Sequence, residues 1–172
     1  MNNYIPKDNS ISHSQILFKD YNEYNTPIII REMVSVLTKR LRTSKKQTGV
    51  VGLGIGYSKD VGGGFYHTQK LDISTFKEEE ILKICLNIFD KYYTNGMPIR
   101  KVSISLGKLS NDNGIQLNLF ENYVAINSEK NKDLTIDKLK EKFGDNIILK
   151  ASSLLEDSTI KDRNNKIGGH NA

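Results

Sequence analysis

Three glycines alternate with aliphatic residues near position 50, and glycine-rich segments can bind phosphate groups. They are Gly52, Gly54 and Gly56. A dinucleotide-binding loop needs a further glycine at fixed spacing and a helix directly after it, and a phosphate-binding loop needs Gly-Lys-Ser or Gly-Lys-Thr at a helix start. Here Tyr57-Ser58-Lys59 leads into another turn and strand. The segment is therefore interpreted as a strand with one bare face, which permits close approach by another backbone or a packed helix.

Side chains that could hold a metal or perform acid–base chemistry are scattered along the sequence. His13, His67 and His170 have no carboxylate or cysteine at the spacing of metal ligands. Glu78-Glu79-Glu80 begins an expected helix, where negative charge is favoured by the helix dipole, so capping explains this run better than catalysis. The sequence suggests neither paired aspartates for magnesium nor a Ser/His/Asp set. The residues alone favour a binding module.

A polar, cationic and aromatic group of residues could contact the phosphate backbone of nucleic acid. Antiparallel strands that carry such side chains can follow phosphates without reading bases. The alternative interpretation is an ordinary solvated sheet face. The candidate residues are Ser58, Lys59, Tyr66, His67, Thr68, Gln69, Lys70, Arg100 and Lys101.

The segment Gln116-Leu117-Asn118-Leu119-Phe120 indicates a protein partner. Turn-forming residues precede it, so we expect the pentapeptide to lie on a flexible tether. Leu119 and Phe120 could fill an apolar pocket on another protein while Gln116 forms a hydrogen bond at the pocket rim. Alternatively, these apolar side chains fold back onto their own domain.

Hydrophobic periodicity predicts the elements that position these residues. Thr26 and Pro27 are expected to open the first helix, with Thr26 as a cap, and Thr75 and Glu78 are spaced as a capping box for the second. The predicted order is strand, helix, strand, strand, helix, strand. This order predicts an α+β fold of the split βαβ, ferredoxin-like kind, with a four-stranded antiparallel sheet, two helices on one face and the other face free to bind. The predicted strands are 10–21, 48–59, 65–73 and 99–109, and the predicted helices are 26–42 and 75–96.

The chain of 172 residues is expected to form one domain with extensions. A short helix closed by Gly144 and a strand at Ile147–Leu149 are expected after the pentapeptide. The expected divisions are a disordered lead-in at 1–9, the split βαβ domain at 10–110, a tether with the pentapeptide at 111–121, the helix and strand extension at 122–157 and a disordered tail at 158–172.

Composition sets further bounds on partners and location. The formal net charge of +5 favours polyanionic partners, although only weakly because acidic and basic residues are interspersed. The single cysteine, Cys85, lies on an apolar helical stripe, which argues against a disulfide scaffold or a zinc knuckle and predicts a core residue. No apolar run reaches membrane-spanning length, and the first residues do not resemble a secretory signal. We therefore expect a cytoplasmic monomer without a membrane partner.

Several short segments follow one another in an order that is typical of a known family. They are Ser10–Gln15, Gly54–Ser58 with Gly63-Gly64-Phe65, Gly96–Arg100, Gln116–Phe120, Lys142-Phe143-Gly144, Ala151–Leu155 and Ile167–His170. Together they resemble the C-terminal part of Y-family translesion DNA polymerases, the UmuC-like and UV-repair group of Gram-positive bacteria, their plasmids and phages.

The resemblance implies a little finger domain that grips damaged template–primer DNA without sequence preference, and a role in DNA damage bypass. It places Ser12, His13 and Ser14 in the link that enters this domain, near DNA, and identifies Gln116–Phe120 as a motif for the bacterial sliding clamp. The catalytic carboxylates and their magnesium would belong to a palm domain preceding Ser10, so this chain is expected to hold no cofactor and not to polymerise DNA. The alternative is a stand-alone nucleic-acid-binding or regulatory protein of the same fold.

Overall fold

The computed structural model describes residues 10–111, 123–167 and 170–171. The chain divides into two compact units, Met1–Asp112 and Asn113–Ala172. Each unit is described by itself. Among the described residues, no helix is both long enough and apolar enough to span a membrane.

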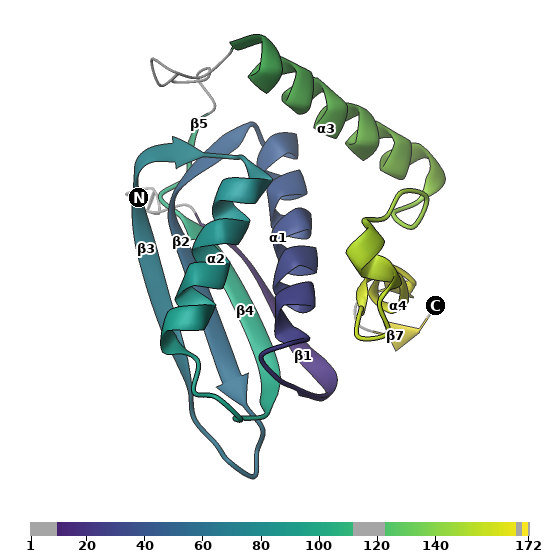
Figure 1. Cartoon of the computed structure of the whole chain (residues 1–172). Coiled ribbons are helices and arrows are strands. Elements are labelled where there is room, and N and C mark those ends of the chain that lie inside the picture. The colour runs from purple at the N-terminus through teal and green to yellow at the C-terminus, as the bar shows by residue number, and fades with distance from the viewer. Residues whose placement is uncertain (1–9, 112–122, 168–169, 172) are drawn as a thin grey trace, which may run out of the picture. The chain divides into compact units, whose positions relative to one another are not determined.

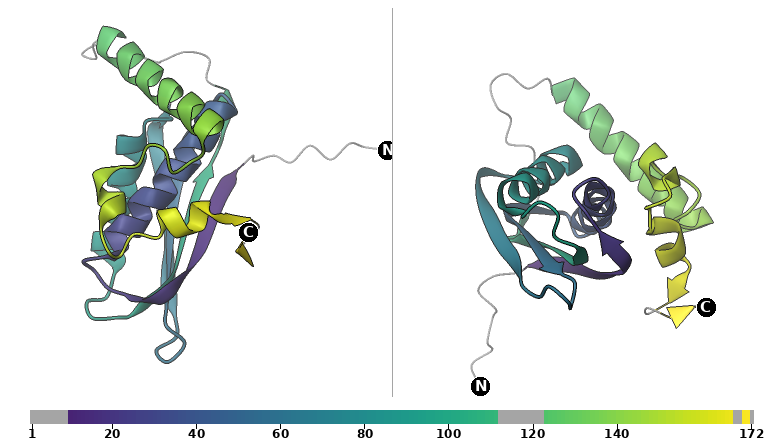
Figure 2. Two further views of the ribbon diagram at one scale, coloured as in Figure 1. Left: turned by 90° about the vertical axis from the view of Figure 1, so that its right-hand side faces the viewer. Right: turned by 60° about the horizontal axis from the view of Figure 1, so that its bottom comes forward.

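The first unit is an antiparallel sheet with both of its helices on one face (Figures 1 and 2). The strand order is β1-β4-β2-β3, and the two-residue β5 pairs with the start of β2. Both strand–helix–strand connections are split, because β4 lies between β1 and β2 while β2 lies between β4 and β3. The structure thus confirms the predicted α+β class and the predicted antiparallel sheet with two helices on one face. The elements are β1 (Ile11–Tyr21), α1 (Thr26–Thr43), β2 (Lys46–Tyr57), β3 (Gly64–Thr75), α2 (Glu78–Tyr92), β4 (Ile99–Gly107) and β5 (Ser110–Asn111).

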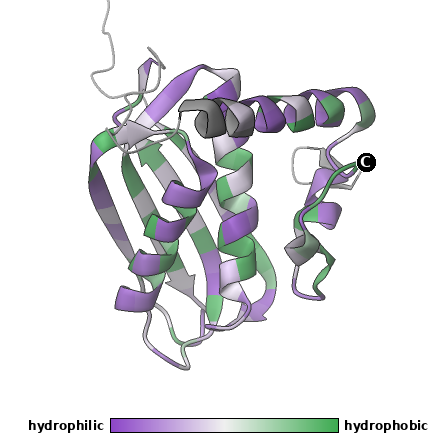
Figure 3. Ribbon diagram, turned by 45° about the horizontal axis from the view of Figure 1, so that its top comes forward, coloured by the Kyte–Doolittle hydropathy of each residue, from purple (hydrophilic) through white to green (hydrophobic). Residues whose placement is uncertain are grey.

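The core lies between the sheet and the two helices. Residues of β4 alternate between buried and more exposed positions, whereas Val51–Ile55 of β2 are all buried. Figure 3 shows apolar and polar residues interspersed along the strands and helices. Leu53 of β2 lies opposite Ile104 of β4, and both side chains are almost fully buried. Burying one such side chain contributes about 1.5–3 kcal/mol, so the buried side chains of this layer stabilise the unit strongly. The strand residues of the core are Leu17, Tyr21, Val51, Leu53, Ile55, Ile99, Val102, Ile104 and Leu106.

The start of α1 differs from the expected cap. The helix begins at Thr26 and carries Pro27 in its first turn, as predicted. The N-cap position, however, is occupied by Asn25, and the buried Thr26 hydroxyl has no hydrogen-bond partner among the described residues. The expectation that Thr26 caps the helix is therefore wrong. The Asn25 side chain instead accepts a hydrogen bond from the backbone N–H of Asn22 at 2.8 Å and closes the preceding turn.

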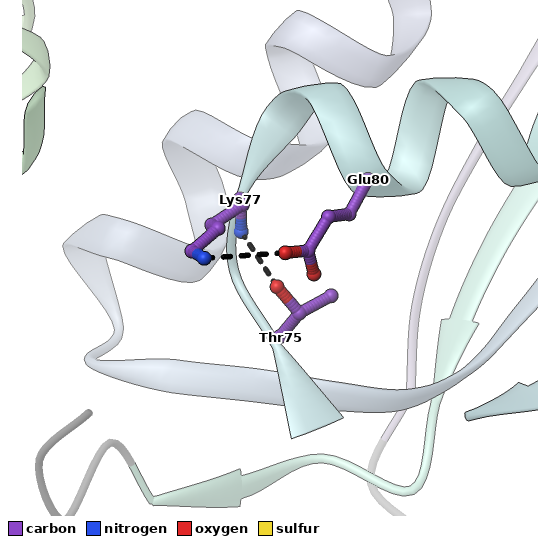
Figure 4. A network of polar contacts seen from close by, with 3 residues as sticks. All are labelled: Thr75, Lys77 and Glu80. Atoms are coloured by element: carbon purple, nitrogen blue, oxygen red, sulfur yellow. Dashed lines mark hydrogen bonds and ion pairs between the residues drawn. The ribbon is translucent and has the colours of Figure 1, made fainter. Parts of the chain in front are cut away.

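The start of α2 also differs from the predicted capping box. The N-cap position is Lys77, and the hydroxyl of Thr75 accepts a hydrogen bond from the Lys77 backbone N–H at 3.1 Å (Figure 4). Thr75 is the last residue of β3 and lies two positions before the cap, so its hydroxyl closes a turn and does not pair with Glu78. Lys77 Nζ also lies 3.3 Å from Glu80 Oε1. The acidic first turn agrees with the predicted dipole interaction.

The second unit contains more helix than was predicted. The helix α3 (Tyr123–Phe143) begins well before the apolar residues that indicated it. Its end agrees with the prediction, because Gly144 follows with a φ of +94° and its N–H bonds to the carbonyl of Lys140 at 2.8 Å. The expected strand at Ile147–Leu149 is wrong, since this segment belongs to a turn in which the Ile147 N–H bonds to the Gly144 carbonyl at 3.2 Å.

The described part of the second unit beyond Lys150 is also folded. It contains η1 (Ala151–Leu154), α4 (Ile160–Asn164), β6 (Lys166–Ile167) and β7 (His170–Asn171). The Asn146 side chain ties the turn after α3 to the end of α4 through hydrogen bonds with Asn164 at 2.8 Å and Asn165 at 3.1 Å. The expectation that residues 158–172 are wholly disordered is therefore wrong for this part. Hydrogen bonds between polar side chains produce no hydrophobic periodicity, so the sequence pattern does not indicate this folded segment.

Candidate nucleic-acid interface

The helix-free face of the sheet carries three rows of residues that are mostly glycine, serine and threonine, which we call the serine–glycine face. Each row crosses the strands in the order β1, β4, β2, β3. Because glycine has no side chain, side chains of the neighbouring strands can lie close to the backbone of β2. The rows are Ser12–Ser105–Gly52–Thr68, Ser14–Ser103–Gly54–Tyr66 and Ile16–Lys101–Gly56–Gly64.

The chemistry of this face is defined by hydroxyl groups and two lysines. Lys101 lies in the third row, and Lys70 follows Thr68 along β3, opposite Val50; both lysines are exposed. The three rows contain no carboxylate. Hydroxyls and lysines are groups that donate hydrogen bonds to phosphate oxygens. Within these three rows no carboxylate would repel a polyanion.

The structure separates the candidate residues into three groups. Six of them lie on the serine–glycine face, namely Ser12, Ser14, Tyr66, Thr68, Lys70 and Lys101. Three others lie on the helix-covered side, since adjacent residues of a strand point to opposite faces. His13 lies opposite Ile104, His67 opposite Leu53 and Gln69 opposite Val51. A DNA segment resting on the serine–glycine face would not meet these three side chains.

The remaining three candidates lie at the end of the sheet near the β2–β3 turn. Ser58 is buried, its N–H bonds to the Pro98 carbonyl at 2.8 Å and its own carbonyl accepts the Gly62 N–H at 2.8 Å. It therefore holds the turn in place. Lys59 is exposed in that turn. Arg100 Nη1 lies 3.3 Å from Asp20 Oδ1 in a surface ion pair, which contributes little to stability.

The glycines of β2 do not form the bare surface that their alternation indicated. The side chain of Tyr66 covers two of them, and its hydroxyl lies 2.7 Å from the hydroxyl of Ser105 on β4. Ser103 donates a hydrogen bond to the Gly54 carbonyl at 3.3 Å. Ser103 and Ser105 were not among the candidate residues. Their alternation with Ile104 and Leu106 was visible, but the pairing of serines with glycines depends on the strand register.

The described part of the chain contains neither a cluster of metal ligands nor a reactive cysteine. There, no group of three His, Cys, Asp or Glu residues is placed to hold a metal ion. Cys85 is fully buried, and burial raises the pKa of its thiol to about 12. The pentapeptide Gln116–Phe120 lies outside the described residues, so its packing or docking stays a prediction.

Comparison with known proteins identifies the family. The model of the impB/mucB/samB family C-terminal domain matches residues 8–119, and the chain belongs to this family. It is 35% identical over 165 residues to the "Putative UV-damage repair protein UvrX" of Bacillus subtilis, a match that covers 94% of this chain and 38% of the relative. It is 30% identical over 166 residues to "DNA polymerase IV 2" of Halalkalibacterium halodurans, covering 95% of this chain and 40% of that protein. The chain thus spans about two fifths of the length of these relatives.

A solved structure described as "Complex of beta-clamp processivity factor and little finger domain of PolIV" also matches. Its TM-score is 0.48 at 14% identity, and the match covers 66% of this chain and all of that one. The family match and the relatives confirm the resemblance to the polymerase and UV-repair group: the chain carries the C-terminal domain of these proteins.

Proposed function

We propose that this chain binds DNA through its serine–glycine face and a bacterial sliding clamp through Gln116–Phe120, as the C-terminal module of a translesion DNA polymerase. In such a protein the polymerase reaction would belong to other domains. The module would act in the cytoplasm, where it would hold the enzyme on damaged template–primer DNA. The family match supports the DNA-repair context.

The observation that carries the DNA-binding proposal is the chemistry of the serine–glycine face. Its hydroxyl groups and its two lysines lie on the side of the sheet that no helix of the first unit covers. Such a surface suits the sugar–phosphate backbone, which presents the same oxygens at every nucleotide. Binding should therefore be independent of sequence and should weaken as salt concentration rises.

Two pairs of lysine variants test whether this face is the DNA-binding surface. Lys70→Ala with Lys101→Ala removes both cations from the face, whereas Lys83→Ala with Lys91→Ala removes two exposed cations from α2 on the other layer. Both double variants have the same net charge. Affinity for a duplex is measured by titration at several salt concentrations. We expect the first pair alone to reduce the slope of log affinity against log salt, by about 0.9 for each phosphate that the protein no longer neutralises.

Equal effects of the two double variants would show that net charge, and not the face, determines binding. An affinity of the unmodified chain that does not vary with salt would reject the DNA-binding proposal. Circular dichroism of each variant shows whether the fold is retained.

The clamp proposal is supported by the side chains of the pentapeptide. Leu119→Ala with Phe120→Ala should abolish retention of the chain by an immobilised bacterial sliding clamp, because these side chains would fill its apolar pocket. Leu154→Ala with Leu155→Ala is the matched control, since this exposed pair of the second unit loses similar apolar surface. Unchanged retention of the first variant would reject the proposal. A clamp loaded on DNA should bind the chain more tightly than the clamp alone, because two linked contacts add avidity.

A further inference from the structure

The side chain of Tyr66 crosses the surface of β2. Tyr66 lies on β3 opposite Gly54. A Cβ atom built on Gly54 would lie 3.1 Å from Tyr66 Cδ2, and one on Gly52 would lie 2.6 Å from the Tyr66 hydroxyl oxygen. That hydroxyl reaches Ser105 on β4 at 2.7 Å. The ring therefore lies over both glycines, with its hydroxyl bound at the far side of β2.

The open side of this ring faces solvent. Tyr66 is 57% exposed although its ring rests on the backbone of β2. One side of the ring thus contacts Gly52 and Gly54, while the other side is available to a ligand. The hydroxyl bond to Ser105 restricts rotation of the side chain, so the ring is held in place before a ligand binds. An aromatic ring fixed in this way is a platform for another flat group.

The position of the Tyr66 ring requires glycine at positions 52 and 54. A methyl group at Gly54 would clash with Ser103 Oγ and crowd the Tyr66 ring, whereas the nearest backbone atom, Phe65 O, is 3.6 Å away. An alanine here would therefore displace the ring while the strands keep their positions. Gly107 on β4 offers a contrast, since its added Cβ would meet only Val50 Cβ at an ordinary 3.8 Å.

We propose that the open side of the Tyr66 ring stacks on an unpaired base of DNA. This inference rests on the proposed binding of DNA to the serine–glycine face. Bases within a duplex are already stacked on both sides, whereas an unpaired template base has a free flat side. The ring occupies the rows of Gly52 and Gly54, with Lys70 beyond one end and Lys101 beyond the other. The lysines are thus placed to hold phosphates on both sides of a stacked nucleotide, which would favour a junction of duplex and single strand.

The test compares two DNA molecules of equal duplex length. One is a blunt duplex, and the other is a template–primer junction with an unpaired template strand. Tyr66→Ala and Gly54→Ala should each weaken binding of the 172-residue chain to the junction by about fivefold or more, as expected for loss of one stacked base. Binding to the blunt duplex should change by less than about twofold. Tyr66→Phe keeps the ring but loses the bond to Ser105, so it should weaken junction binding less than Tyr66→Ala does. Gly107→Ala should behave as the unmodified chain on both molecules.

Other outcomes separate this inference from the proposed function. Equal losses on the junction and the blunt duplex would mean that the ring contacts sugars of paired DNA, and would overturn the stacking proposal. Unchanged junction binding by Tyr66→Ala would also overturn it, while leaving the proposed DNA-binding function intact. If the unmodified chain binds neither molecule, both proposals fail. Thermal unfolding followed by circular dichroism shows whether Gly54→Ala is folded. If it is not, Tyr66→Ala alone supplies the test.

Discussion

The ring of His67 on β3 stacks on the ring of Tyr92 on α2, with their centroids 3.6 Å apart and their planes 15° from parallel. Phe65 extends this cluster, because its ring lies 6.0 Å from His67 and 6.2 Å from Tyr92. The cluster joins an edge strand to the helix that covers it. His67 thus has a structural partner on the face opposite Tyr66, although the sequence predicts DNA contact for both.

Replacing His67 with alanine should therefore affect stability and not DNA binding. Loss of the stack should lower the free energy of unfolding by about 0.5–1.5 kcal/mol. DNA affinity should remain within about twofold, because the side chain lies on the helix-covered side. Urea unfolding and DNA titration measure the two quantities. Thr68→Ala, one residue along on the serine–glycine face, is the control for stability, and a stable His67→Ala protein that loses DNA binding would contradict the assignment.

The sequence predicts the two layers of the first unit well but the binding face only in part. Alternation along β2 shows that Val51, Leu53 and Ile55 share a face, and this face is buried. The polar run at 66–70 has no such contrast, so the sequence suggests a single surface. In the strand its members alternate between the two faces, and only the register with Leu53 and Gly54 shows which side each residue occupies.

The second unit shows a different limit of what can be predicted from the sequence. Ile147, Ile148 and Leu149 have high strand propensity, but the turn that follows α3 extends to Ile147, whose N–H bonds to the Gly144 carbonyl. Propensity is a weak guide where a strand has no partner to pair with. Asn146 forms its contacts with residues 18 and 19 positions away, and no local pattern predicts such pairing.

Gly64 at the start of β3 should be the least replaceable glycine of the hairpin. Its φ is +143°, and an added Cβ would collide with the backbone carbonyl oxygen of Ile55. A backbone atom cannot move aside as the end of a side chain can, so Gly64→Ala should lower the free energy of unfolding by about 3 kcal/mol or more. Gly62→Ala is the matched control. Its φ is +72° with nothing within 4 Å of the added Cβ, so the cost should be only about 1 kcal/mol.

These two variants are compared by urea unfolding. Similar losses for Gly62→Ala and Gly64→Ala would show that the positive φ alone, without the collision, determines the cost.

Tyr93 should make the stability of the first unit depend on pH in alkaline solution. Its hydroxyl lies 2.8 Å from the Met97 carbonyl and 3.1 Å from Glu23 Oε2, to which it donates. Desolvation and the Glu23 carboxylate raise the pKa of Tyr93 to about 12. The unfolded chain loses this proton near pH 10. Stability from this group is therefore complete below about pH 10 and is lost as the pH rises toward 12.

Tyr93→Phe should remove this part of the pH dependence. The difference in unfolding free energy between the two proteins should shrink as the pH rises from about 10 to 12, since the unmodified chain loses what the variant already lacks. Chemical unfolding at a series of pH values measures it. Tyr24→Phe, at a position that is 82% exposed, is the control. A constant difference across this pH range would contradict the interpretation.

Cys85 should report on unfolding of the first unit. It is the single cysteine of the chain, is fully buried, and its thiol pKa is raised to about 12 by burial. At about pH 8 very little thiolate is present, and the thiolate is the form that reacts with disulfide reagents. The folded chain should therefore be labelled only through unfolding, so the labelling rate should rise steeply with urea. A Ser14→Cys variant in a Cys85→Ala background places a thiol on the exposed edge strand and should react at once without urea. Rapid labelling of the unmodified chain in native buffer would show that the core around α2 opens locally without global unfolding.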